Sequence, residues 1–219
     1  IPAILWWMDI NPDQVVEAGL LKPNDWKVFF FTKYNQILLQ SLNSVILLDH
    51  FMARRVKKAY VLPDSHIVSL WPLVQQKTKI NSPKNFLNNH GLLGKIVIMY
   101  SGNHSLAHPL DTLLESMKGY ENRQDVSFVF VGDGPGKAVV TKWKHKHSLV
   151  PVKQLPYQPL EIIDESLGAA DLHVVSMGTE MSGCVHPSKA YTALAMGKPL
   201  LYLGPKESAI GQWINSNLI

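Results

Sequence analysis

Apolar and polar residues follow one another along the chain in blocks that have the lengths of strands and helices. Six short runs are almost wholly apolar, as in strands that are buried on both faces; they are residues 3–8, 44–48, 95–100, 127–131, 172–176 and 199–203. Between most of them lie segments with helical spacing, at residues 25–41, 109–117, 138–147, 159–169 and 187–196. This alternation predicts parallel βαβ units, and therefore an α/β fold with the carboxyl ends of its strands along one edge.

One segment breaks the alternation. Residues 69–91 carry two prolines and many amides, and they show no sustained period. A long unstructured stretch is uncommon inside a compact domain, so we predict an interdomain connector at residues 71–91. It separates a smaller part, residues 1–70, from a nearly complete βαβ domain at residues 92–219.

Composition excludes several classes of protein. The chain has 219 residues, of which 46% are hydrophobic and 17% charged, so it is globular and not disordered. A net charge of +4 does not by itself predict nucleic-acid binding. The single cysteine, Cys184, allows no internal disulfide and favours a reducing compartment. No apolar run approaches the roughly 20 residues that span a bilayer.

Known catalytic signatures are also missing from the sequence. The nine histidines lack metal-ligand spacing, and neither a P-loop nor a GxSxG motif is present. The chain opens directly into an apolar run without an initiator methionine, and it ends in a helix-like segment without a cap. We therefore expect it to be part of a longer protein.

Four loops follow strands at the edge where ligands of such sheets bind. The first contains Ser101, Gly102 and Asn103, and the second is the glycine-rich segment that starts at Gly132. Glycine there indicates either close approach of a ligand to the backbone or a simple tight turn. In the third loop, after Leu155, Tyr157 either stacks on a base or packs.

The fourth loop ends in Pro187-Ser188-Lys189, in front of a short apolar helix pattern. Proline suits the first helical turn, where its missing N–H would be unpaired in any case. The free N–H groups and the dipole at a helix start favour an anion, whereas the charge of a lysine opposes that dipole. A lysine in this place indicates a negatively charged ligand beside it.

Taken in order, these segments resemble the family 4 retaining glycosyltransferases of the GT-B fold. The resemblance covers most of the chain and rests on the ordered set LWWMDINPDQVVEAGLL, SVILLDHFMARRVKK, LPDSHIVSLWP, YSGNHSLAHPLDTLLES, FVFVGDGPGK, LPYQPLEIIDESLGAADLHVVS and GCVHPSKAYTALAMGKPLLYLG. The chain is most similar to the branch that makes bacterial surface polysaccharides, which carries Pro-Ser-Lys. The resemblance implies two Rossmann-like domains, the N-terminal one incomplete and the C-terminal one truncated at its end.

The resemblance also implies a function: transfer of a sugar from a nucleotide-diphosphate donor, a UDP- or GDP-sugar, to a saccharide or lipid-linked acceptor with retention. The chain would carry mainly the donor-binding half, and by itself it would be inactive. Lys189 would be the catalytic residue, because its charge offsets the charge that builds up on the leaving diphosphate. The donor would contact Ser101, Gly102, Asn103, Pro187 and Lys189 through its diphosphate, Ser188 through a phosphate oxygen or its ribose, Thr192 through its ribose, and Gly132, Leu155 and Tyr157 through its base.

The sequence departs from the family pattern at two places. Alignment on Gly197 puts Cys184 and Thr192 where many members carry two glutamates. Near the first loop, Asn103 and His104 stand in place of an expected arginine and lysine. Lys189 would then be the main phosphate cation, and we expect neither a metal nor a cofactor.

Two other functions stay open. One is a sugar-nucleotide epimerase of the same fold, and the other is a noncatalytic α/β nucleotide-binding module. The expected location is the cytoplasm or the inner face of the membrane, with peripheral contact through the missing N-terminal part and with no nucleic-acid partner. The sequence leaves the sugar, the base, the acceptor and the oligomeric state open.

Overall fold

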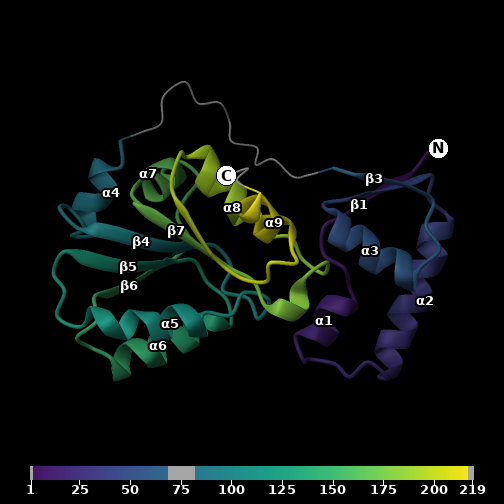
Figure 1. Ribbon diagram of the computed structural model, residues 1–219, viewed down its shortest axis with the longest axis horizontal. Coiled ribbons are helices and arrows are strands. Elements are labelled where there is room, and N and C mark those ends of the chain that lie inside the picture. The colour runs from purple at the N-terminus through teal and green to yellow at the C-terminus, as the bar shows by residue number, and fades with distance from the viewer. Residues whose placement is uncertain (1, 69–81, 217–219) are drawn as a thin grey trace. The chain divides into compact units, whose positions relative to one another are not determined.

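The computed structural model describes residues 2–68 and 82–216, which form parallel α/β structure (Figure 1). The strands are β1 (Ile4–Trp7), β2 (Ser44–Leu47), β3 (Asp64–Ile67), β4 (Ile96–Ser101), β5 (Val126–Val131), β6 (Val152–Leu155), β7 (Leu172–Ser176) and β8 (Leu200–Leu203). The α-helices are α1 (Asp13–Glu17), α2 (Trp26–Gln40), α3 (His50–Ala59), α4 (Lys84–Asn89), α5 (Asp111–Met117), α6 (Gly136–Lys146), α7 (Ile163–Gly168), α8 (Lys189–Ala195) and α9 (Ala209–Asn215). Two short 3-10 helices are η1 (Lys118–Tyr120) and η2 (Thr179–Met181).

The chain divides into two compact units. The first unit consists of Ile1–Leu70, Met177–Pro187 and Gly204–Ile219, and the second of Trp71–Ser176 and Ser188–Leu203. The predicted domains are consecutive segments, whereas these units are not. Residues 177–187 group with the first unit because their backbone is bonded there: the Ile10 N–H donates to the Cys184 carbonyl at 2.9 Å.

The predicted connector, residues 71–91, is described in part. Residues 71–81 lie outside the described residues. Further along, Lys84–Asn89 form α4, whose Phe86 is buried in the core of the second unit. This part of the segment is therefore helical, which its amide-rich sequence does not predict.

The second unit contains a five-stranded parallel sheet in the order β6-β5-β4-β7-β8. All six residues of β5 are buried, and their side chains alternate between two cores. Phe128 and Phe130 pack in one core with residues of α5 and α6, whereas Val129 and Val131 pack in the other with Phe86 of α4. Figure 1 shows α5 and α6 along one face of this sheet and α4 and α7 along the other.

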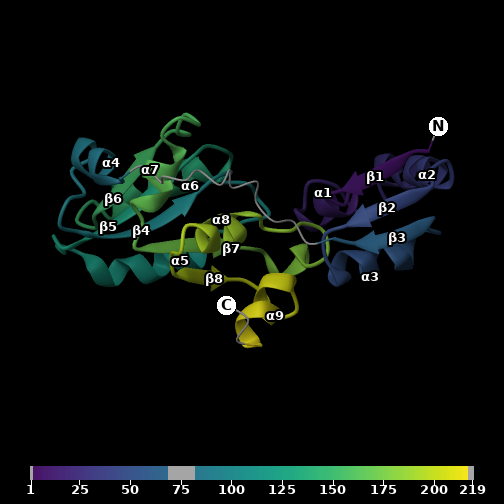
Figure 2. The ribbon, with the colours of Figure 1, turned by 90° about the horizontal axis from the view of Figure 1, so that it is seen from above.

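The first unit contains a three-stranded parallel sheet in the order β1-β2-β3, seen side by side in Figure 2. A core of strand residues with Leu39 of α2 and Met52 and Val56 of α3 covers one face. On β1 the alternate residues Ile4 and Trp6 are exposed. At β1, one face of this sheet is therefore covered by the core and the other is exposed, because successive side chains of a strand point to opposite faces.

Most of the predicted elements are present, with small shifts at their ends. β7 has the predicted bounds, and α2 begins after Asp25, whose carboxylate accepts from the Lys27 N–H at 2.8 Å. The segment predicted as a helix at 159–169 is helical only over Ile163–Gly168. β3 was not predicted, because the sequence Asp-Ser-His-Ile is polar and forms an exposed edge strand held by β2.

Candidate functional site

The carboxyl end of β4 is the point where the strand order of the second unit reverses. β4 pairs with β5 on one side and with β7 on the other, and later strands continue outward from both neighbours. Open α/β sheets bind ligands in the crevice at such a switch point. The structure therefore places the loops after β4 and β7 where a ligand site is expected.

A cavity of about 250 Å³ lies in this region of the second unit. Its wall joins the end of β4, the strand β7, and the helices α7 and α8; the lining residues are Ser101, Gly102, Ile163, Leu167, His173, Val174, Val175, Ser188, Lys189, Thr192 and Ala193. Five of the predicted site residues are among them: Ser101, Gly102, Ser188, Lys189 and Thr192. Segments nearly 90 residues apart along the chain thus contribute to one site.

Among these residues, Lys189 is a cation whose hydrogen-bond partners are all uncharged. Its ammonium donates to the Tyr100 hydroxyl and, at 3.0 Å, to the Asn103 carbonyl oxygen, and it lies 4.0 Å from the centre of the Tyr100 ring. No carboxylate pairs with it among residues 2–68 and 82–216. Burial lowers the pKa of Lys189 to about 7, because a desolvated ammonium without a counter-charge is unfavourable.

Tyr100 and Asn103 are the hydrogen-bond partners of Lys189. The Tyr100 hydroxyl donates to the Asn103 carbonyl at 2.9 Å, and burial raises the pKa of this phenol well above its usual value. The phenol therefore stays neutral and supplies no counter-charge. Tyr100 was missed in the sequence, because a tyrosine near the end of an apolar strand has the pattern of a core residue.

Two histidines near Lys189 are also uncharged. His108 bonds the Ser176 carbonyl oxygen through Nδ1 at 2.6 Å, and burial, followed by the charge of Lys189, lowers its pKa to about 4. The ring of His104 is buried and neither of its nitrogens has a partner. Burial and then Lys189 lower the pKa of His104 as well.

The glycines of the first two loops serve close packing of protein against protein. A Cβ on Gly102 would lie 2.9 Å from Cε of Lys189, and its N–H donates to the Val131 carbonyl at 2.9 Å. A Cβ on Gly132 would lie 2.1 Å from the Gly102 carbonyl oxygen. Gly102 therefore leaves room for the lysine stem, and its φ of 124° is one that residues with a side chain rarely adopt.

The remaining predicted residues do not line the cavity. The N–H of Gly132 donates to the Leu155 carbonyl at 3.0 Å, and Leu155 is half-buried at the end of β6. Tyr157 is 55% exposed, which leaves its ring free for stacking. Pro187 is buried and groups with the first unit.

Cys184, at one of the expected glutamate positions, is fully buried within the first unit. Burial raises the pKa of its thiol to about 12, so it stays protonated at neutral pH. It therefore supplies no negative charge in place of a carboxylate. Thr192, at the other position, lines the cavity with a hydroxyl.

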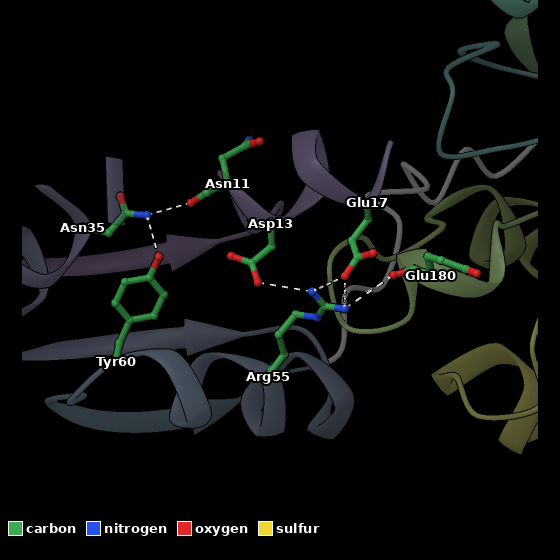
Figure 3. A network of polar contacts seen from close by, with 7 residues as sticks. All are labelled: Asn11, Asp13, Glu17, Asn35, Arg55, Tyr60 and Glu180. Atoms are coloured by element: carbon green, nitrogen blue, oxygen red, sulfur yellow. Dashed lines mark hydrogen bonds and ion pairs between the residues drawn. The ribbon is translucent and has the colours of Figure 1, made fainter. Parts of the chain in front are cut away.

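A separate polar network lies in the first unit (Figure 3). The Arg55 guanidinium donates two hydrogen bonds to Glu17 at 2.9 Å and one to Asp13 at 3.2 Å, and it reaches the Glu180 carbonyl at 3.5 Å. Nearby, His186 Nδ1 lies 2.6 Å from the buried carboxylate of Asp49. These bonds fix residues 177–187 to α1 and α3, and so hold the chain just before Ser188.

No family model matches the chain. It is 24% identical over 209 residues to a probable glycosyltransferase, WbjE, of Pseudomonas aeruginosa, covering 94% of this chain and 52% of that protein. The chain thus spans about half the length of this relative.

Two solved structures show the same fold. WaaG, a glycosyltransferase involved in lipopolysaccharide biosynthesis, aligns with a TM-score of 0.68 at 14% identity, over 99% of this chain and 60% of that one. HepE of Anabaena in complex with UDP-glucose aligns with a TM-score of 0.67 at 13% identity, over 99% of this chain and 62% of that one. The chain therefore has the α/β fold of the GT-B glycosyltransferases.

Proposed function

We propose that this chain carries the donor-binding part of a glycosyltransferase that uses a nucleotide-diphosphate sugar. The observation that carries the proposal is Lys189, a half-buried cation that pairs with no carboxylate of the described residues and lines a cavity at the switch point of the sheet. A diphosphate is the kind of ligand that would complete such a site, since it brings the missing negative charge. Similarity to WbjE and the GT-B fold support the same reading.

In this proposal Lys189 binds the diphosphate and offsets the charge that develops as the sugar leaves. Ser188 and Ser101 offer hydroxyls from the cavity wall, and Thr192 offers one to the ribose. The base would lie near Gly132, Leu155 and the exposed ring of Tyr157. Base stacking on an aromatic ring needs such an exposed face.

The finer features of the function are part of the proposal. The donor would be a UDP- or GDP-sugar, transfer would occur with retention, and the acceptor would be a saccharide or a lipid-linked saccharide. The structure of HepE was solved with UDP-glucose, which favours a UDP-sugar here as the first ligand to test. We propose the cytoplasm or the inner face of the membrane as the location of the reaction. Among the described residues, no helix has the length and apolar character needed to cross a bilayer.

A noncatalytic nucleotide-binding module is the second candidate. It is favoured by the cavity lining, which contains no aspartate or glutamate, and by the buried, protonated thiol of Cys184 at one glutamate position. Both candidates need the nucleotide site, and only the first needs transfer.

Calorimetric titration of the chain with UDP, GDP and ADP tests the shared site. We expect one nucleotide to bind, and Lys189→Ala to weaken it by about 1–3 kcal/mol, as for a lost charged hydrogen bond. The matched control is Lys118→Ala, because Lys118 is in the same unit but pairs with Glu115 at 2.6 Å. Equal affinity in all three proteins, or no binding at millimolar concentration, would contradict the proposal.

A further inference from the structure

The region around Lys189 contains several titratable groups, but no carboxylate of the described residues pairs with its ammonium. The Lys189 ammonium lies over the ring of Tyr100 of β4. His104 and His108 belong to the loop after β4 and interact with Lys189 through charge. His173 of β7 lines the cavity. Asp133, after β5, affects His104 and is paired with Lys137 at 3.0 Å. Desolvation by burial is the cause that lowers the pKa of Lys189.

The groups that contact Lys189 carry no charge. Its ammonium has a phenol hydroxyl and a carbonyl oxygen as partners, and its stem crosses Gly102 so closely that a Cβ there would clash at 2.9 Å. The side chain is therefore half-buried, and the two polar partners of its ammonium carry no net charge. Under these conditions an amine releases its proton more readily than in water.

From this geometry we propose that the cavity takes up a proton when it binds an anionic ligand, and that the proton goes to Lys189. The inference rests on the proposed function, since it takes the diphosphate of a nucleotide sugar as the anion. In the empty site the ammonium has no counter-charge, whereas in the complex it faces a dianion. The ligand therefore stabilises the protonated amine, and the affinity depends on pH.

The direction of the effect follows from linkage. The pKa of Lys189 is about 7 in the empty site, and a bound dianion raises it. Below that value the amine is already protonated, so binding takes up little and the affinity is constant. Above it, each ligand that binds takes up close to one proton, and the affinity falls by about tenfold per pH unit until the pKa of the complex is reached.

The two nearby imidazoles are not the groups that take up the proton. The Nδ1 of His108 is already engaged by the Ser176 carbonyl, and its pKa of about 4 keeps it neutral from pH 6 upward. His104 is buried against the rings of Tyr100 and Phe130, and burial lowers its pKa. Both lie in the field of Lys189, which opposes a second positive charge.

The test is calorimetric titration of this chain with UDP-glucose between about pH 6 and pH 9, in HEPES and in Tris, whose ionisation enthalpies differ. UDP-glucose suits the purpose because its diphosphate is esterified at both ends, so that each phosphate stays singly charged over this range. UDP does not, since its terminal phosphate titrates near pH 6. The buffer dependence of the binding heat gives the number of protons taken up.

We expect uptake of close to one proton at pH 8.5 and of almost none near pH 6, with about tenfold weaker binding per unit above pH 7. In Lys189→Arg the guanidinium stays charged, so uptake should vanish and the affinity should become independent of pH. His104→Gln should keep the uptake of the parent chain.

Three results would overturn the inference in different ways. Binding of UDP-glucose with no uptake and constant affinity would refute proton coupling and leave the proposed function standing. Uptake that persists in Lys189→Arg would assign the proton to another group. Absence of binding by UDP-glucose and also by GDP-mannose would remove the proposed function, and the inference with it.

Discussion

The two parallel sheets of this chain differ in what covers them. In the second unit, five strands are packed between helices on both faces, and β5 is buried along its whole length. In the first unit, three strands have a core on one face, while Ile4 and Trp6 of β1 are 62% and 53% exposed. The difference locates the candidate site: the sheet with two cores also has the strand reversal at which Lys189 lies.

The helices of the two units show the same difference. Of the 15 residues of α2 only Leu39 is buried, and its exposed side chains include Trp26, Phe29 and Phe30. In the second unit, the seven-residue α5 buries Leu113, Leu114 and Met117. An apolar sequence therefore indicates a core position in one unit and a surface position in the other.

The largest effect on stability should come from the double-faced core. Phe128 is 3% exposed and contacts Tyr120 edge to face with 5.1 Å between ring centres. We expect Phe128→Ala to lower the free energy of unfolding by about 3–5 kcal/mol, because it leaves a cavity in a packed interior. Urea denaturation followed by circular dichroism measures this. A loss below about 1 kcal/mol would show that the sheet is not packed on this face.

A smaller effect should follow loss of the Asp49 carboxylate. It accepts from the Met52 N–H at 2.8 Å as the N-cap of α3, and it also pairs with buried His186. We expect Asp49→Ala to cost about 2–4 kcal/mol in the same assay, since a helix cap and a buried partner are both lost.

Asp25→Ala is the matched control, because Asp25 caps α2 through one exposed bond at 2.8 Å. Its loss should cost only about 1 kcal/mol. If the two variants were equally destabilised, the contact between Asp49 and His186 would contribute nothing to stability.

The thiol of Cys184 reports on the interior of the first unit. With a pKa of about 12 it is almost wholly protonated at pH 8. Since the thiolate is the reactive form, the folded chain should react with a disulfide reagent about a thousandfold more slowly than a free cysteine. The rate should rise to the free value in urea. Fast reaction of the folded chain would place the thiol at the surface.

The smallest effect should come from the exposed side of α2. Phe29 and Phe30 are 66% and 57% exposed. We expect Phe29→Gln and Phe30→Gln each to change the free energy of unfolding by no more than about 0.5 kcal/mol. Binding of a hydrophobic dye should fall, because the apolar patch becomes smaller. A loss above 2 kcal/mol would show that these rings are packed.

The sequence predicts the second unit well, because burial on both faces leaves apolar runs bounded by turn residues. The run at 172–176 is a strand with the same bounds in the structure. The edge strand β3 could not be predicted, since Asp64 and His66 are placed by pairing with β2 and not by their own pattern. The helix α4 was not predicted either, because its amide-rich sequence lacks a helical pattern of apolar residues.

The sequence indicates which loops follow the strands of the sheet, but it does not show which side chains touch one another in the candidate site. Ser101, Gly102, Ser188, Lys189 and Thr192 line one cavity, as loops at strand ends should. The part played by Tyr100 could not be predicted, because a buried tyrosine in an apolar strand is usually a core residue. Nor does a sequence show that the space over Gly102 is taken by the stem of a lysine from a distant helix.

The central claim is that Lys189 binds the diphosphate of a nucleotide sugar. The most direct test is a crystal structure of this chain with UDP-glucose. We predict a diphosphate oxygen within about 3 Å of Nζ of Lys189, the length of a charge-assisted hydrogen bond, in the cavity lined by Ser101 and Thr192. UDP-glucose bound elsewhere, with the contacts of Lys189 to Tyr100 and Asn103 unchanged, would contradict it.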